Sequence, residues 1–217
     1  MKNIFSSEII TSLKENGILP VVCLTAQNEL DTFIQALTKT PIRCIEITLR
    51  HPFSPEAISF IKNNYPQFVV GAGTVINKDL FDCAVESGAD FCVSPGYDRE
   101  IIDEAFNRSI PFLPGCSTPS EIQQAVKSGL RTLKYFPAEC SGGINALKLY
   151  QGAFADATFI PTGGINQNNY LQYLRCENVL ACGGSFMIPK EMLVSGNSEG
   201  IYNVLLGCLN AVKEVRK

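Results

Sequence analysis

The chain has 217 residues, of which 46% are hydrophobic and 18% charged, and its net charge at pH 7 is −3 with a single histidine. These values are typical of a soluble globular protein, and the length fits one large domain or two small ones. Lysine and arginine are scattered rather than gathered in a basic stripe, which argues against a nucleic-acid partner. The sequence has neither a run of roughly 18 apolar residues nor a signal-peptide core, so we expect a cytoplasmic protein with no membrane partner.

The nine cysteines are odd in number and irregularly spaced, with no C-x-x-C pair and no Cys/His pair at zinc-finger spacing. Several of them, including Cys23, Cys44 and Cys92, lie in apolar runs, where cysteine packs as a small hydrophobic residue. The pattern predicts reduced core thiols in a cytoplasmic protein.

Short apolar runs recur along the chain, and each predicts a buried β-strand. They cover residues 18–24, 44–49, 68–75, 91–95, 110–115, 132–137, 158–164 and 179–185. Their starts lie about 20 to 26 residues apart, which leaves room for one strand, one helix and two short loops in each unit.

The segments between these runs have helical patterning. Residues 28–39 repeat apolar side chains at helical spacing. Residues 77–90 offer Asn77 as N-cap and Gly88 as the residue that ends a helix, and residues 118–130 have comparable start and stop signals.

Strands that alternate with helices imply a parallel sheet with right-handed crossovers. Eight such units close into a (β/α)8 TIM barrel, so we expect an α/β protein with a single barrel domain over residues 1–217. An open doubly wound sheet is the alternative, but the even spacing and the lack of G-x-G-x-x-G at the first helix argue against it. The leading segment, Ser6 to Asn16, is predicted to form an additional N-terminal helix that covers the bottom of the barrel.

The motif "EITLR" is the first candidate for chemistry, because active-site groups of such barrels lie at the C-terminal ends of the strands. With a period of two, Glu46, Thr48 and Arg50 share one face and are expected to point into the barrel. A structural ion pair between Glu46 and Arg50 is one interpretation. An acid–base carboxylate beside an anion-binding guanidinium is the favoured one.

Lys134 is the second candidate, because it interrupts the apolar run "TLKYFP". Its amine either reaches water past the rim of the barrel or is enclosed. Enclosure would remove hydration and favour the neutral amine, which can attack a carbonyl group to form an imine.

Glycine-rich strand ends form the remaining candidates. In "GAGTV", Gly71 to Val75, glycine would allow a ligand or another chain segment to approach closely, although barrel cores also use glycine for packing, and Thr74 offers a hydroxyl and a backbone N–H. The motifs "PTGG" (161–164) and "CGGS" (182–185) end the last two predicted strands, where barrels commonly bind phosphate through backbone N–H groups.

Together these motifs resemble the 2-keto-3-deoxy-6-phosphogluconate (KDPG) aldolase / 4-hydroxy-2-oxoglutarate (KHG) aldolase family over nearly the whole chain. The matching motifs are, in order, "EITLR", "VVGAGTV", "SPG", "PGCSTPSE", "LKYFPAE", "PTGGI" and "GGS". The resemblance implies a compact (β/α)8 barrel that forms a homotrimer and works as a class I aldolase. It also implies that no metal and no cofactor are needed beyond a covalent imine on Lys134.

The resemblance further implies a role for each candidate residue. Lys134 would be the Schiff-base lysine and Glu46 the general acid and base, while Arg50 and Thr74 would bind the carboxylate of the pyruvate part. Phe136 and Thr162 would line the substrate, and Gly163, Gly164, Gly184 and Ser185 would hold phosphate.

The implied reaction is cleavage of 2-dehydro-3-deoxy-6-phosphogluconate to pyruvate and glyceraldehyde 3-phosphate, a step of the Entner–Doudoroff pathway of carbohydrate metabolism. Cleavage of 4-hydroxy-2-oxoglutarate to pyruvate and glyoxylate is expected as well. A phosphosugar isomerase or synthase barrel, in which Lys134 forms no imine, is the main alternative, and a non-catalytic sugar-acid binding protein is another. His51 is expected to be a solvated loop residue, since Glu46 already supplies the acid–base group.

Overall fold

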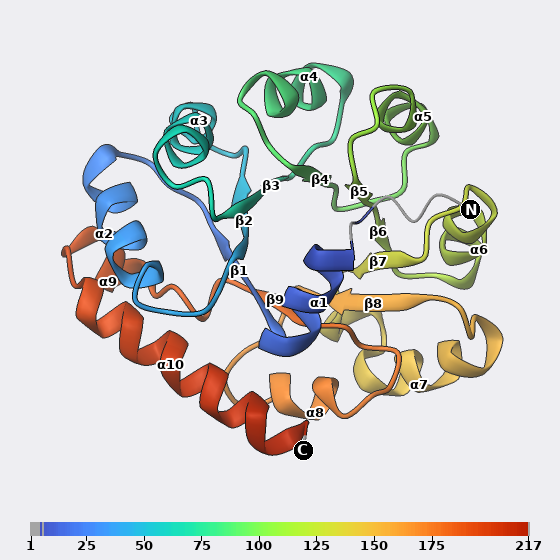
Figure 1. Ribbon diagram of the computed structural model, residues 1–217. Coiled ribbons are helices and arrows are strands. Elements are labelled where there is room, and N and C mark those ends of the chain that lie inside the picture. The colour runs from blue at the N-terminus through green and yellow to red at the C-terminus, as the bar shows by residue number, and fades with distance from the viewer. Residues whose placement is uncertain (1–4, 6, 217) are drawn as a thin grey trace.

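The computed structural model describes residue 5 and residues 7–216. Its strands are β1 (Ile18–Val22), β2 (Cys44–Thr48), β3 (Val69–Gly73), β4 (Phe91–Val93), β5 (Phe112–Leu113), β6 (Gly115–Cys116), β7 (Thr132–Tyr135), β8 (Thr158–Pro161) and β9 (Cys182–Gly184). Its helices are α1 (Ser7–Asn16), α2 (Gln27–Leu37), α3 (Ser54–Asn64), α4 (Lys78–Glu86), α5 (Arg99–Asn107), α6 (Pro119–Lys127), α7 (Gly143–Ala153), α8 (Tyr170–Leu174), α9 (Lys190–Val194) and α10 (Ser198–Val215), with a 3-10 turn η1 (Glu139–Ser141). Figure 1 shows the strands at the centre and most of the helices around them.

The strands pair in parallel and form two sheets, one with the order β5-β4-β3-β2-β1-β9 and one with the order β6-β7-β8. Strands that alternate with helices and pair in parallel confirm the predicted α/β class. The closed eight-stranded barrel stays a prediction.

The expected fifth strand, residues 110–115, was wrong as a single element. The structure divides this region into β5 and β6, which are separated by Pro114. Proline has no N–H to give to a strand ladder. The next residue, Gly115, lies close to the backbone of the loop after β4. A Cβ on Gly115 would be 2.0 Å from the carbonyl oxygen of Pro95.

Local signals explain where the helices begin and end. The side chain of Asn77 accepts a hydrogen bond of 2.8 Å from the N–H of Leu80 at the start of α4, and Gly88 follows the helix with a φ of +82°. Both features agree with the predicted helix at 77–90. The predicted N-terminal helix is α1, and Ser6, at the start of the predicted range, lies outside the described residues.

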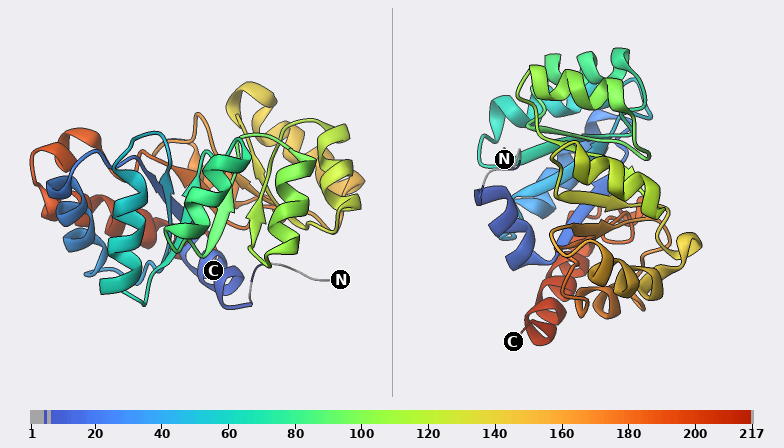
Figure 2. Two further views of the ribbon diagram at one scale, coloured as in Figure 1. Left: turned by 90° about the horizontal axis from the view of Figure 1, so that it is seen from above. Right: turned by 90° about the vertical axis from the view of Figure 1, so that its right-hand side faces the viewer.

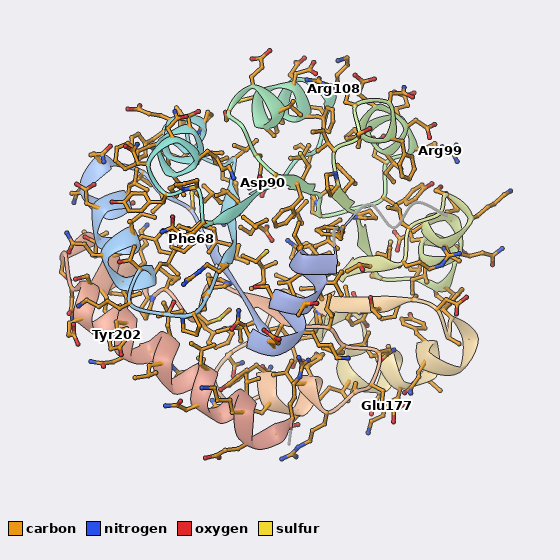
Figure 3. The ribbon with its side chains drawn as sticks, viewed as in Figure 1. Phe68, Asp90, Arg99, Arg108, Glu177 and Tyr202 are labelled. Atoms are coloured by element: carbon orange, nitrogen blue, oxygen red, sulfur yellow. The ribbon has the colours of Figure 1, made fainter. Side chains whose placement is uncertain are left out.

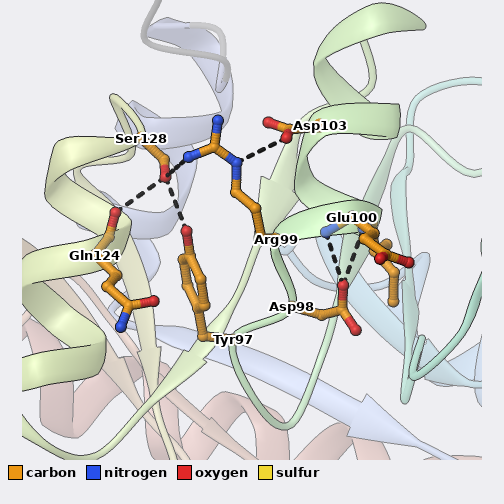
Figure 4. A network of polar contacts seen from close by, with 8 residues as sticks. Tyr97, Asp98, Arg99, Glu100, Asp103, Gln124 and Ser128 are labelled. Carbon is orange, nitrogen blue, oxygen red and sulfur yellow. Dashed lines mark hydrogen bonds and ion pairs between the residues drawn. The ribbon is translucent and has the colours of Figure 1, made fainter.

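Neighbouring helices are also linked at the surface, as Figure 4 shows for α5 and α6. The hydroxyls of Tyr97 and Ser128 lie 2.9 Å apart, and Arg99 donates a hydrogen bond of 3.4 Å to the same Ser128 hydroxyl. Asp98 caps α5 by accepting from the N–H groups of Glu100 and Ile101. These contacts fix the first turn of α5 against the last turn of α6.

The core has two parts. The larger lies between the strands and the surrounding helices, and the smaller contains side chains from α1 together with side chains from the strands. The smaller cluster includes Phe5, Ile9, Leu13, Leu19, Phe91, Val93, Leu113 and Ile160. In Figure 2, α1 lies across one end of the strands. Figure 3 shows charged side chains such as Arg99, Arg108 and Glu177 at the periphery.

All nine cysteines are free. Cys44, Cys92, Cys116, Cys176, Cys182 and Cys208 are buried, as predicted for core thiols. The prediction was wrong for Cys140, which is exposed on η1, and Cys23 and Cys83 are half-buried. Among the described helices, none has the length and apolar character that a membrane span requires.

Candidate active site

Lys134 and Glu46 form a buried pair between the two sheets. Lys134 lies on β7 and is 6% exposed, and Glu46 lies on β2 and is 1% exposed. The Nζ of Lys134 is 3.1 Å from Oε1 and 3.5 Å from Oε2 of Glu46. The sequence left two possibilities for this amine, enclosure or contact with water past the rim of the barrel. The structure shows that it is enclosed. Within the described part of the chain, the ion-pair partner of Glu46 is Lys134, not Arg50.

The position of Glu46 depends on a glycine in the neighbouring strand. A Cβ on Gly73 would lie 2.3 Å from Oε1 of Glu46, so the carboxylate occupies space that any larger residue would fill. At Gly71 a Cβ would lie 2.2 Å from the Cζ of Phe91. Of the alternatives for the glycines of "GAGTV", the structure supports close packing at these two positions, because side chains of this chain fill the space.

A cavity of about 220 Å³ opens beside the Lys134–Glu46 pair. Every site residue expected from the sequence lines it, namely Glu46, Arg50, Thr74, Lys134, Phe136, Thr162, Gly163, Gly164, Gly184 and Ser185. The lining also includes Val21, Thr48, Pro95 and Ile165. Thr48 shares the inward face of β2, and Pro95 and Ile165 belong to the motifs "SPG" and "PTGGI". Val21 was not predicted as a site residue, because an apolar residue in a buried strand gives no sequence signal for binding.

Arg50 lies at the mouth of the cavity rather than in the barrel interior. Strand β2 ends at Thr48, so the alternation that was expected to turn Arg50 inward stops two residues before it. Arg50 is exposed, and its Nε donates a hydrogen bond of 3.2 Å to the hydroxyl of Thr48. This guanidinium is available to an anion that enters the cavity.

Thr74 has a backbone conformation that is unusual for its residue type. It follows β3, is half-buried and has a φ of +65°. Residues other than glycine rarely adopt this left-handed region, and such strain is concentrated at functional sites. The strain supports the choice of Thr74 as a binding residue.

The loop after β8 turns through two glycines in the left-handed region, Gly163 with φ +89° and Gly164 with φ +82°. The loop after β7 holds it in place, because the N–H of Ala138 donates to the carbonyl of Thr162 at 2.8 Å and that of Glu139 to Gly163 at 3.2 Å. Successive backbone N–H groups in such turns form concave anion sites.

Two further residues complete the surroundings. Phe136 presents its ring to the amine, with the Nζ of Lys134 5.6 Å from the ring centroid, which is within the range of a cation–π contact. His51 is a half-buried loop residue whose Nδ1 accepts a hydrogen bond of 3.2 Å from the N–H of Phe53, at the start of α3. Among the described residues, no group of three or more His, Cys, Asp or Glu side chains could hold a metal ion.

An enclosed amine in contact with a buried carboxylate, with a guanidinium at the mouth of the cavity, is the arrangement of an enzyme that forms an imine with an acidic carbonyl compound. On a parallel α/β fold it defines the class of Schiff-base aldolases.

Comparison with known proteins supports this class. The family model for KDPG and KHG aldolase matches residues 9–204. The 2-dehydro-3-deoxy-phosphogluconate aldolase of Pseudomonas aeruginosa is 38% identical, over 98% of this chain and 96% of the relative. The KHG/KDPG aldolase of Escherichia coli K12 is 36% identical, over 98% of this chain and all of the relative.

A solved structure gives the same result. KDPG aldolase from Legionella pneumophila, with pyruvate captured at low pH as a covalent carbinolamine intermediate, superposes with a TM-score of 0.88 at 34% sequence identity. The match covers 92% of this chain and 97% of that one. This chain belongs to the KDPG and KHG aldolase family and is a lyase of the Schiff-base type.

Proposed function

We propose that this enzyme cleaves 2-dehydro-3-deoxy-6-phosphogluconate to pyruvate and glyceraldehyde 3-phosphate, and 4-hydroxy-2-oxoglutarate to pyruvate and glyoxylate. The observation that carries the proposal is the enclosed Nζ of Lys134, 3.1 Å from a carboxylate oxygen of Glu46. The substrates are supported by the names of the relatives, which include both KDPG and KHG aldolases. In this mechanism Lys134 forms the imine directly with the substrate, so no separate cofactor is required.

The reaction begins with a proton transfer inside the buried pair. When the Lys134 ammonium gives a proton to Glu46, a neutral amine and a carboxylic acid result. The amine attacks the C2 ketone of the substrate and forms a carbinolamine. Glu46 then protonates the departing hydroxyl, water leaves, and a protonated imine remains on Lys134.

The protonated imine is the electron sink for cleavage. The C4 hydroxyl gives its proton to the Glu46 carboxylate, the C3–C4 bond breaks, and its electron pair moves into the imine to give an enamine and a free aldehyde. The enamine takes a proton at C3, and water hydrolyses the resulting imine. Pyruvate leaves and the amine of Lys134 is restored.

The remaining cavity residues would orient the substrate. In this proposal Arg50 and Thr74 bind the C1 carboxylate at the mouth of the cavity, and Thr162 and Phe136 contact the carbon chain. The distal phosphate would lie against the loops after β8 and β9, through Gly163, Gly164, Gly184 and Ser185. The left-handed turn at Gly163 and Gly164 supports this placement, since backbone N–H groups are then free of strand pairing.

We also propose that residues 1–217 form one domain and that its two sheets close into a single (β/α)8 barrel. Only Pro114 separates β5 from β6, and an isolated parallel bridge joins Phe159 of β8 to Val179, three residues before β9. The family resemblance favours a homotrimer. The nine free cysteines favour a cytoplasmic location, because oxidising compartments convert thiols to disulfides.

The direct test of this function is pyruvate release from each substrate, followed through lactate dehydrogenase. We expect turnover by the wild-type enzyme and loss of activity in Lys134→Met. Lys148→Met, which changes an exposed lysine of α7, is the matched control and should keep full activity. Equal activity in Lys134→Met and the wild type would exclude the imine mechanism and favour a barrel enzyme of another class.

A further inference from the structure

A second cavity, larger than the one beside Lys134, opens next to the candidate active site. Its volume is about 390 Å³. It is lined by Val21, Val22, Cys23, Thr25, Arg50, Ser185, Ile188, Lys190 and Leu193. Three of these residues, Val21, Arg50 and Ser185, also line the cavity that holds Lys134. A ligand bound at Lys134 can therefore extend past Arg50 and Ser185 into this second cavity.

The charge of the second cavity is positive. Arg50 and Lys190 line it, and no aspartate or glutamate does. Thr25 of the lining is bonded to a carboxylate outside it, that of Glu29, which is buried and accepts hydrogen bonds of 2.7 and 2.9 Å from the backbone N–H and hydroxyl of Thr25. Among the ion pairs formed by the described residues, none involves Arg50 or Lys190. Because the proposed function assigns Arg50 to the C1 carboxylate, Lys190 is the lining cation left for a second anionic group of the substrate.

One short segment places Lys190 near the proposed phosphate loop. After β9 the chain makes a turn in which the N–H of Ile188 donates to the carbonyl of Ser185 at 3.0 Å. The turn leads through Pro189 into α9, whose first residue is Lys190. Ser185 and Lys190 thus line one cavity from the two ends of one short segment, residues 185–190.

We propose that the second cavity is a distal anion subsite and that Lys190 is a residue that determines specificity for a phosphorylated aldehyde half of the substrate. The inference rests on the proposed aldolase function. The Lys190 ammonium would supply one charge-assisted contact to the phosphate, in addition to the contacts from Ser185 and the glycine loops. A substrate that lacks the phosphate would gain nothing from Lys190.

The test uses the reverse reaction, in which pyruvate condenses with glyceraldehyde 3-phosphate or with unphosphorylated glyceraldehyde. These two acceptors differ only in the phosphate. We expect Lys190→Gln to reduce kcat/KM for glyceraldehyde 3-phosphate about tenfold, which corresponds to about 1.4 kcal/mol, mainly through KM. For glyceraldehyde the change should stay within about twofold, the size of a neutral surface substitution. Lys213→Gln on α10, another exposed lysine, is the matched control and should change neither value.

Equal losses with both acceptors, or no loss with either, would overturn the subsite. Inorganic phosphate provides a second measurement, since it should inhibit the wild type more strongly than Lys190→Gln, and equal inhibition would contradict the proposal. Lys190→Arg should retain most of the preference, because it keeps the charge. Borohydride trapping of pyruvate on the wild type separates the two proposals. If trapping fails, the aldolase function is wrong, whereas trapping without a phosphate-selective loss rejects only the role of Lys190.

Discussion

Oε1 of Glu46 lies where a side chain on Gly73 would begin, at 2.3 Å from the ideal Cβ position. The same oxygen is 3.1 Å from the Nζ of Lys134. Gly73 thus sets the position of the carboxylate relative to the amine, although no atom of Gly73 takes part in the proposed chemistry.

The substitution Gly73→Ala is therefore expected to displace Glu46 and to slow proton transfer. We expect kcat to fall about 10²- to 10⁴-fold, the contribution typical of a positioned acid–base group. The fold should lose about 1 to 3 kcal/mol of stability, because the core is overpacked. Steady-state pyruvate release and urea unfolding measure the two effects.

Gly207→Ala is the control for this substitution. A Cβ on Gly207, in α10, meets no atom within 4 Å. Alanine there should leave kcat unchanged and stabilise the helix by up to about 1 kcal/mol. If Gly73→Ala kept the kcat of the wild type, the carboxylate would not need its present position and its assigned role would be wrong.

Tyr173 is expected to support the phosphate loop through Glu139. The buried hydroxyl of Tyr173 donates a hydrogen bond to Oε1 of Glu139, and a Cβ on Gly164 would lie 2.5 Å from the Cγ of Glu139. Tyr173→Phe should raise KM for the phosphorylated substrate about 3- to 10-fold, since Glu139 is exposed and the net contribution of such a hydrogen bond is about 0.5 to 1.5 kcal/mol. The kcat value should change little. A fall in kcat at constant KM would show that Tyr173 acts on the chemistry instead.

Stability is expected to fall in alkaline solution because of buried tyrosines. Burial, with smaller effects of Tyr150 and Glu139, raises the pKa of Tyr135 to about 12. In the unfolded chain its pKa is about 10. Between these values the unfolded state loses the proton while the folded state keeps it, so unfolding becomes easier as pH rises.

The free energy of unfolding, measured in urea from pH 9 to 12, should begin to fall near pH 10. The slope should become shallower in Tyr135→Phe, which has no phenol to ionise. The same pH dependence in both proteins would show that Tyr135 does not contribute.

The cysteines are expected to react very unequally with alkylating reagents. Burial raises the pKa of Cys92 and of Cys116 to about 12, so both remain protonated thiols at neutral pH, and only the thiolate is a good nucleophile. Cys140 is exposed. Iodoacetamide at pH 8 followed by peptide mass mapping should label Cys140 first and leave Cys92 and Cys116 unlabelled in the folded protein. Rapid labelling of Cys116 would contradict the burial described for β6.

The sequence predicted best what depends on local periodicity. Alternation along "EITL" placed Glu46 and Thr48 on one inward face, and the Asn77 cap located the start of α4. Both follow from the backbone of a few consecutive residues, and the structure agrees with them. The parallel α/β class followed in the same way, from the regular spacing of the apolar runs.

Other features depend on contacts between distant residues, and these could not be predicted from local patterns. The partner of Glu46 is Lys134, 88 residues further along the chain. The space beside Gly73 is filled by the side chain of Glu46, which belongs to the neighbouring strand β2. Lys190 gave no signal because its proposed role depends on the cavity that it lines together with Arg50 and Ser185.

The central claim is that Lys134 forms the imine, and reductive trapping tests it most directly. The wild-type enzyme, incubated with pyruvate and sodium borohydride, should gain one reduced pyruvate adduct, and peptide mapping should locate it on Lys134. Lys134→Met should gain none. An adduct on another lysine, or no adduct while the enzyme releases pyruvate from its substrate, would contradict the mechanism.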